Sequence, residues 1–122
     1  MNDCEKLIIS TWLEKILHVD FMGRDILRAQ LSLASVSIHQ CFEHISVKFQ
    51  VEDALLFTHN VRVPVQMVAW QENGVPIVFL LHVINGFIDE LEVVMMDASK
   101  INVHDVDLSK VEYDVNKLVS FS

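Results

Sequence analysis

Residues 80–97 read LLHVINGFIDELEVVMMD, and the Asn85-Gly86 dipeptide in the middle of this stretch predicts a turn between two strands. Asparagine and glycine tolerate the positive φ angles of a type I′ turn, so the apolar runs on either side are expected to pair as an antiparallel hairpin. A second dipeptide of the same kind, Asn73-Gly74, precedes the first of these runs. The two turns together predict a three-stranded meander over about residues 61–72, 75–84 and 87–96.

The register of this meander assigns its side chains to two faces. If each turn has two residues, Glu72 faces Val75 and Ile84 faces Phe87, and side chains alternate from there. The face expected to lie under the helices consists of Val63, Val65, Met67, Ala69, Val78, Leu80, Ile84, Phe87, Leu91, Val93 and Met95, with His82 directly opposite Asp89. The other face consists of Gln66, Val68, Trp70, Ile77, Phe79, Leu81, Val83, Ile88, Glu90, Glu92 and Val94. Because this second face mixes large apolar side chains with two carboxylates, it is the one expected to bind a partner.

The remaining segments predict helices before the meander and another hairpin. Apolar residues at helical spacing favour an amphipathic helix over about residues 4–18 with Asp3 as its cap, and a shorter helix over residues 23–31. From Ala34 the apolar period changes to two, which predicts two strands that turn near residues 42–44. The tail fits a helix and a strand about equally. The expected fold is α+β in a single domain 1–122, with one or two N-terminal helices (1–32), an antiparallel sheet of about five strands (34–97) and an acidic tail of undecided structure (98–122).

Composition limits the class of protein. The chain has 122 residues, enough to bury about two thirds of its surface around one core. Hydrophobic residues make up 52% and charged residues 21%, which excludes general disorder. No apolar run approaches the roughly 20 residues of a membrane helix, and the N-terminus does not resemble a signal peptide. Two cysteines are too few for a disulfide framework, so a cytoplasmic protein with free thiols is expected.

The net charge of -8 is concentrated in the C-terminal third, where residues 89–114 contain eight acids and only two lysines. Such a field repels nucleic acid and anionic membranes, and it speeds encounter with a basic protein surface. The alternative is that these acids only keep a hydrophobic chain in solution, and composition alone does not separate the two readings.

Possible catalytic and metal-binding groups are sparse. His82 opposite Asp89 could form an acid/base dyad, but a buried polar pair is favoured because no nucleophile is expected nearby. His39, Cys41 and His44, with Cys4 or His18, could bind zinc, but their spacing matches no zinc motif. Arg24 and Arg28 could bind a phosphate, although a solvated helix face explains them better. We therefore expect no catalytic residue, no metal and no cofactor.

Two segments carry a family resemblance. Residues 23–31, GRDILRAQL, and residues 80–92, LLHVINGFIDELE, resemble a family of small bacterial proteins of unknown function that have a G-R-x-x-L-R-x-Q-[LV] helix and an L-x-V-x-x-G-x-[LI]-x-x-L-E hairpin. The matching residues are Gly23, Arg24, Leu27, Arg28, Gln30, Leu31, Leu81, Val83, Gly86, Ile88, Leu91 and Glu92. The resemblance implies helices on an antiparallel sheet and no active site. The small, acidic, single-domain format is also similar to immunity proteins of bacterial toxin systems.

The expected function is that of a binding protein, not an enzyme, that neutralises a cognate bacterial toxin, expected to be a basic nuclease domain. Its partner-binding residues are predicted to be an apolar centre and an acidic margin, namely Trp70, Phe79 and Val68 with Glu90, Glu92, Asp97, Asp105 and Asp107. The alternatives are a small cytosolic enzyme that uses His82 and Asp89, or an accessory subunit of a larger assembly.

Overall fold

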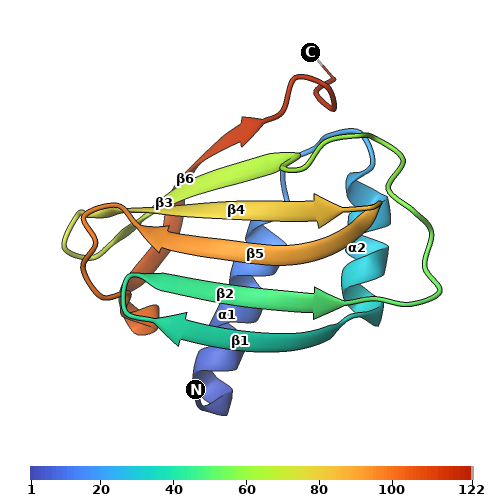
Figure 1. The fold of residues 1–122 in the computed structure, drawn as a ribbon. Helices are drawn as coiled ribbons and strands as arrows, with labels where there is room; N and C mark the ends of the chain where they lie inside the picture. The colour runs from blue at the N-terminus through green and yellow to red at the C-terminus, as the bar shows by residue number, and fades with distance from the viewer. Residues whose placement is uncertain (122) are drawn as a thin grey trace.

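The computed structural model describes residues 1–121, in which two helices cover one face of a six-stranded antiparallel sheet (Figure 1). The strand order is β1-β2-β5-β4-β3-β6. This confirms the predicted α+β class, with six strands in place of about five. The elements are α1 (Asp3–Ile16), α2 (Arg24–Leu33), β1 (Ser35–Cys41), β2 (His44–Gln50), β3 (Val65–Gln71), β4 (Pro76–Ile84), β5 (Phe87–Met95), a short 3-10 helix η1 (Val103–Asp105) and β6 (Val106–Val115).

Helix α1 lies across the covered face of the sheet. Its cap is Asn2, one residue before the predicted Asp3: the Asn2 side chain accepts a hydrogen bond from the Glu5 N–H, and the Glu5 carboxylate accepts one from the Asn2 N–H. The buried side of the helix includes Trp12, whose ring meets that of Phe79 edge to face at 5.4 Å between centroids. No helix in residues 1–121 combines the length and apolar character needed to cross a membrane.

Helix α2 is fastened to the β4–β5 hairpin by a fully buried glutamine. The Gln30 side-chain amide donates hydrogen bonds to the carbonyls of Leu55 and Gly86, at 2.7 and 2.8 Å, and its oxygen accepts one from the Ile88 N–H at 2.8 Å. Gly23 precedes the helix at φ +86°, and a Cβ at this position would lie 2.4 Å from the ring of Phe57. Two residues of the GRDILRAQL segment therefore have structural roles: Gln30 through its hydrogen bonds and Gly23 through its close approach to Phe57.

The two Asn-Gly turns differ in length. Asn85 and Gly86 form the predicted two-residue turn, with φ values of 53° and 84° and Ile84 opposite Phe87. The loop before β4 has three residues, 72–74: the Gln71 N–H donates to the Val75 carbonyl, and the Trp70 position pairs with Pro76. The expected pairing of Glu72 with Val75 is therefore wrong by one residue.

A bulge at Asp89 causes a second departure from the predicted register. Val83 lies opposite Ile88, but the next residue of β4, His82, lies opposite Glu90, which leaves Asp89 as the extra residue. The bulge places both Ile88 and Leu91 in the core and keeps all three acids of the strand out of it. Without it, strict alternation from Ile88 would have directed Glu90 and Glu92 into the core.

These two shifts invert the predicted faces of β4. The side chains of Ile77, Phe79, Leu81 and Val83 are buried under the helices, whereas Val78, Leu80, His82 and Ile84 are half-buried on the other face. The prediction that Phe79 lies on the partner-binding face was therefore wrong. Phe79 is 0% exposed and belongs to the core.

The C-terminal segment, left undecided between helix and strand, contains η1 and the edge strand β6. Strand β6 pairs with β3, and the register shifts between Val68 and Trp70. The Tyr113 hydroxyl donates to the Lys15 carbonyl at 2.5 Å, which ties β6 to the end of α1. Burial raises the pKa of Tyr113. Ser122, the last residue of the predicted tail, lies outside the described residues.

Candidate partner-binding face

The face of the sheet turned away from the helices, here called the open face, has an apolar centre on β3, β4 and β5. Val68 lies opposite Val78, and Val78 lies opposite Val94, so three valines form a row across the three strands. Trp70 lies two residues beyond Val68 on β3, and Leu80 lies two residues beyond Val78 on β4. None of the five side chains is fully buried within residues 1–121, although each belongs to the middle of a sheet.

A row of acids on β6 borders this apolar centre. Asp107 pairs with Trp70, Glu112 with Val68 and Asp114 with Gln66, so each acid stands beside a residue of β3 on the open face. None of the three forms an ion pair with a described lysine, arginine or histidine. Hydrogen bonds from Ser109 hold the pKa of Asp107 below its usual value. The β6 border is thus negatively charged at neutral pH.

On the other side of the apolar centre, one carboxylate joins two imidazoles. Glu92 on β5 meets His82 of β4 with one oxygen, at 2.9 Å from Nε2, and His44 of β2 with the other, at 3.1 Å from Nε2. These contacts lower the pKa of Glu92, chiefly through the hydrogen bond from His82, and partial burial opposes the effect. The three side chains therefore hold one another in place across three strands.

Glu90 and Asp89 are matched by the neighbouring strand in the same way. The Ser46 hydroxyl donates to the Glu90 carboxylate at 2.5 Å, and the Lys48 ammonium lies 3.4 Å from Glu90 and 3.7 Å from Asp89. The acids of β5 thus stand opposite a serine, a lysine and a histidine supplied by β2. Their partners within the chain explain why this strand contains acids where β4 has apolar residues.

The predicted pair of His82 with Asp89 was wrong. His82 lies on the open face, not in the core, and its partner is Glu92. The reason is the bulge, which moves Asp89 out of the pairing position. The His82 side chain is 15% exposed, and its Nδ1 atom is buried without a hydrogen-bond partner in residues 1–121. A catalytic dyad of His82 and Asp89 is excluded by this geometry.

Two of the other predicted binding residues lie away from the apolar centre. Asp97 follows β5, and hydrogen bonds from Ser99 lower its pKa. Asp105 closes η1, and its carbonyl accepts a hydrogen bond from the Glu72 N–H in the three-residue turn. Both acids therefore belong to the end of the sheet near Asn73-Gly74. Trp70, Val68, Glu90, Glu92 and Asp107 lie on the open face itself.

The suspected metal and phosphate ligands do not form a site. His39 and Cys41 lie exposed on β1, and His44 is engaged by Glu92. Within residues 1–121 no three histidine, cysteine, aspartate or glutamate side chains are placed to hold a metal ion. The Arg24 guanidinium donates to the His18 carbonyl at 3.0 Å and lies near Asp20 and Asp25, so it stabilises the start of α2.

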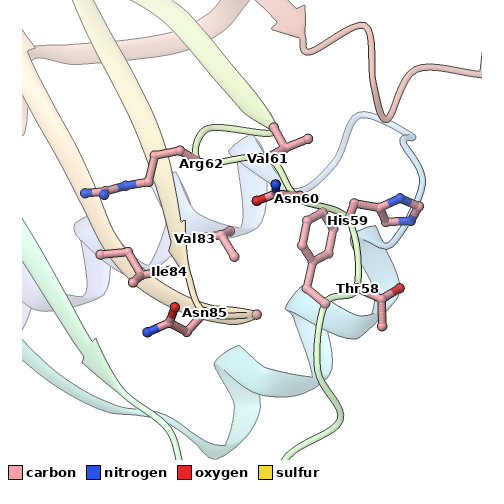
Figure 2. Close-up of a pocket in the computed structure, with 10 residues that line it drawn as sticks. Thr58, His59, Asn60, Val61, Arg62, Val83, Ile84 and Asn85 are labelled. Carbon is pink, nitrogen blue, oxygen red and sulfur yellow. The ribbon is translucent and has the colours of Figure 1, made fainter.

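A pocket of about 370 Å³ lies at the hairpin end of the sheet, between the segment from Phe57 to Arg62 and the residues around Asn85. Figure 2 shows the side chains of Arg62 and His59 extending in opposite directions, so these two side chains do not converge on one ligand. The sequence had indicated only a connection here, because residues 52–60 have no apolar period.

Comparison with known proteins found no match: no family model, no curated protein and no solved structure is similar to this chain. The resemblance to a small bacterial family therefore stays a prediction. Three of its motif residues have a structural role, because Gly23, Gln30 and Gly86 lie where α2 packs against the Phe57 loop and the β4–β5 hairpin.

Proposed function

We propose that this chain is a binding protein that docks a basic protein partner on its open face, and that this partner is a cognate bacterial toxin which it neutralises by direct binding. The observation that carries the proposal is the juxtaposition on the open face of an uncovered apolar centre and the acids of β6. Asp107, Glu112 and Asp114 lack an ion-pair partner within residues 1–121, although Lys110 on the same strand contributes to the lowered pKa of Asp107. A basic surface would supply such a partner.

The two parts of the open face would contribute differently to binding. A typical interface needs about 800 Å² from each partner, with apolar anchors at the centre and charges at the rim. Trp70 is the largest side chain of the centre, and tryptophan is enriched among residues that dominate binding energy. The acids of β6 would mainly speed encounter with a cationic surface.

The His44–Glu92–His82 contacts would contribute by keeping their side chains ordered before binding. Each long side chain that is immobilised on association costs about 0.5–1.5 kcal/mol, and ordering in the free protein avoids that cost. The predicted steering role of Glu90 and Glu92 is weakened by their partners within the chain, so Glu112 provides the sharper test of electrostatic steering.

The toxin assignment rests on the similarity in format to immunity proteins. A nuclease domain binds nucleic acid through a basic surface, and an acidic protein can cover such a surface in its place. The test is to produce the toxic domain encoded beside this chain and to express both proteins in one cell. Restored growth together with a purified stoichiometric complex is expected. A neighbourhood of metabolic genes, with no complex formed, would refute the toxin assignment.

The centre of the interface is tested by Trp70→Ala. Loss of a buried aromatic anchor should raise the dissociation rate by the equivalent of about 2 kcal/mol, or roughly 30-fold. Leu55→Ala, which truncates a 77% exposed side chain on a loop, is the control and should leave the rate unchanged. Equal rates for both variants and the natural chain would place the interface elsewhere.

The charged border is tested by Glu112→Lys. We expect association with the basic partner to slow about two- to fivefold at low salt, and the difference to shrink at high salt because ions screen exposed charges. Glu14→Lys, the same charge change on exposed α1, is the matched control. If both substitutions slow association equally, overall charge rather than the open face determines the rate.

A further inference from the structure

The two edges of the sheet differ in how they are protected against pairing with another chain. Edge strand β6 contains Asp107, Lys110, Glu112 and Asp114, and its pairing with β3 is irregular. Edge strand β1, whose sequence is SVSIHQC, contains no lysine, arginine, acid or proline. Charges and irregularities on an edge strand discourage the addition of a further strand. The β1 edge has none of these features.

The backbone groups that β1 presents outward can be identified from its turn. Cys41 and His44 flank a two-residue turn and form the closing pair of the β1–β2 ladder. Because antiparallel strands turn alternate residues toward and away from each neighbour, the N–H and C=O groups of Val36, Ile38 and Gln40 point away from β2. Strand β1 has no other neighbouring strand in residues 1–121, and the segment at Ile101 meets it only at its end, through the Gln40 side chain.

A groove of about 490 Å³ accompanies this edge, between β1 and α1. Its apolar lining includes Ile9 and Leu13 from α1 and Val36 and Ile38 from β1, and Val36 is 49% exposed. Figure 1 shows the first turns of α1 reaching past β1. The helix layer is therefore wider than the sheet on this side, and side chains of an added strand would find a surface to pack on.

The groove has one charged side chain among its lining residues, that of Lys6. Its ammonium forms no ion pair within residues 1–121, in a chain whose net charge is -8. A carboxylate would be the complementary group. A second copy of the chain fits less well, because an added β1 strand, SVSIHQC, contains no carboxylate to meet Lys6.

We propose that the groove between α1 and β1 binds an extended segment of a partner protein, which adds to the sheet beside β1. The segment has apolar residues at alternate positions, directed into the groove, and a carboxylate that meets Lys6. Its backbone pairs with the outward groups of Val36, Ile38 and Gln40. This surface is separate from the open face, so the proposal does not depend on the toxin assignment.

The experiment selects binders to the purified chain from a library of random nine-residue peptides and measures their affinities by fluorescence polarisation. We expect enriched peptides with alternating apolar residues and an acidic residue. Val36→Pro removes an outward N–H that makes no hydrogen bond within the sheet, so the fold should tolerate the change. Peptide binding should weaken about tenfold. Lys6→Glu should also weaken binding, whereas Lys110→Glu on β6 should not.

Hydrogen exchange locates the bound peptide independently of these variants. The amides of Val36, Ile38 and Gln40 should become protected when peptide is added. The proposal is refuted if no peptide sequence is enriched, if binding is unchanged by Val36→Pro, or if protection appears on β6 instead. Protection of the three amides without peptide, rising with protein concentration as a dimer forms, would also refute it and assign the edge to a second copy.

Discussion

The covered face and the open face of the sheet are made by alternate residues of the same strands, yet they use polar groups in different ways. On the covered face the buried polar side chains are Gln30 and Gln71, and Gln30 is satisfied by backbone groups alone. On the open face one carboxylate, Glu92, contacts two imidazoles, and a second, Glu90, contacts a serine and a lysine. The covered face therefore stabilises the fold, whereas the open face arranges charged groups next to apolar side chains at a surface.

The largest expected difference in stability between the two faces comes from truncating two adjacent residues of β4. Phe79→Ala should reduce the free energy of unfolding by about 3–5 kcal/mol, because it opens a cavity beside Trp12 in the core. Leu80→Ala, the next residue but on the open face, should cost less than about half of that value. Urea denaturation of both variants measures the difference. Equal losses would contradict the assignment of the two faces.

A second test concerns the buried amide of Gln30. Gln30→Leu keeps the approximate volume and removes three hydrogen bonds, so the groups left behind on Leu55, Gly86 and Ile88 should lower the unfolding free energy by about 2–4 kcal/mol. The control is Gln66→Leu on the open face, where the side chain has one long contact of 3.5 Å with Asp114. A loss below about 0.5 kcal/mol for Gln30→Leu would show that the hairpin does not depend on this amide.

The smallest effect is the pH dependence contributed by Glu92. Its pKa is lower in the folded protein than in the unfolded chain, so its contribution to stability is present above the unfolded value of about 4.5 and is lost as the pH falls through the folded value. Glu92→Gln should therefore show a shallower loss of stability than the natural chain between pH 5 and pH 3. The difference should stay below about 1 kcal/mol because the site is partly solvated.

Urea midpoints of both proteins at several pH values measure this difference. Glu14→Gln, at an exposed position of α1, serves as the control. Parallel pH profiles for Glu92→Gln and the natural chain would mean that the two imidazoles do not stabilise the carboxylate.

The faces of β4 show where sequence reasoning failed. Residues 77–81 are apolar without interruption, so their pattern has no period of two and cannot indicate which side is buried. Their faces follow only from the partners, and one residue added to the first loop and one to β5 was enough to invert them. A signal was present in β5: Ile88 and Leu91 are separated by two acids, and a bulge is the arrangement that buries both apolar residues while excluding both acids.

The sequence by itself determined the elements whose causes are local. Helical spacing predicted both helices, alternation predicted the β1–β2 hairpin, and Asn85-Gly86 predicted its two-residue turn, because propensity and turn chemistry act over a few neighbouring residues. Only the tertiary structure decided the buried side of β4, the strand conformation of β6 and the placement of His44, Glu92 and His82 within one network. These features depend on pairing between strands distant in the chain, and a shift of one residue there reverses every side chain that follows.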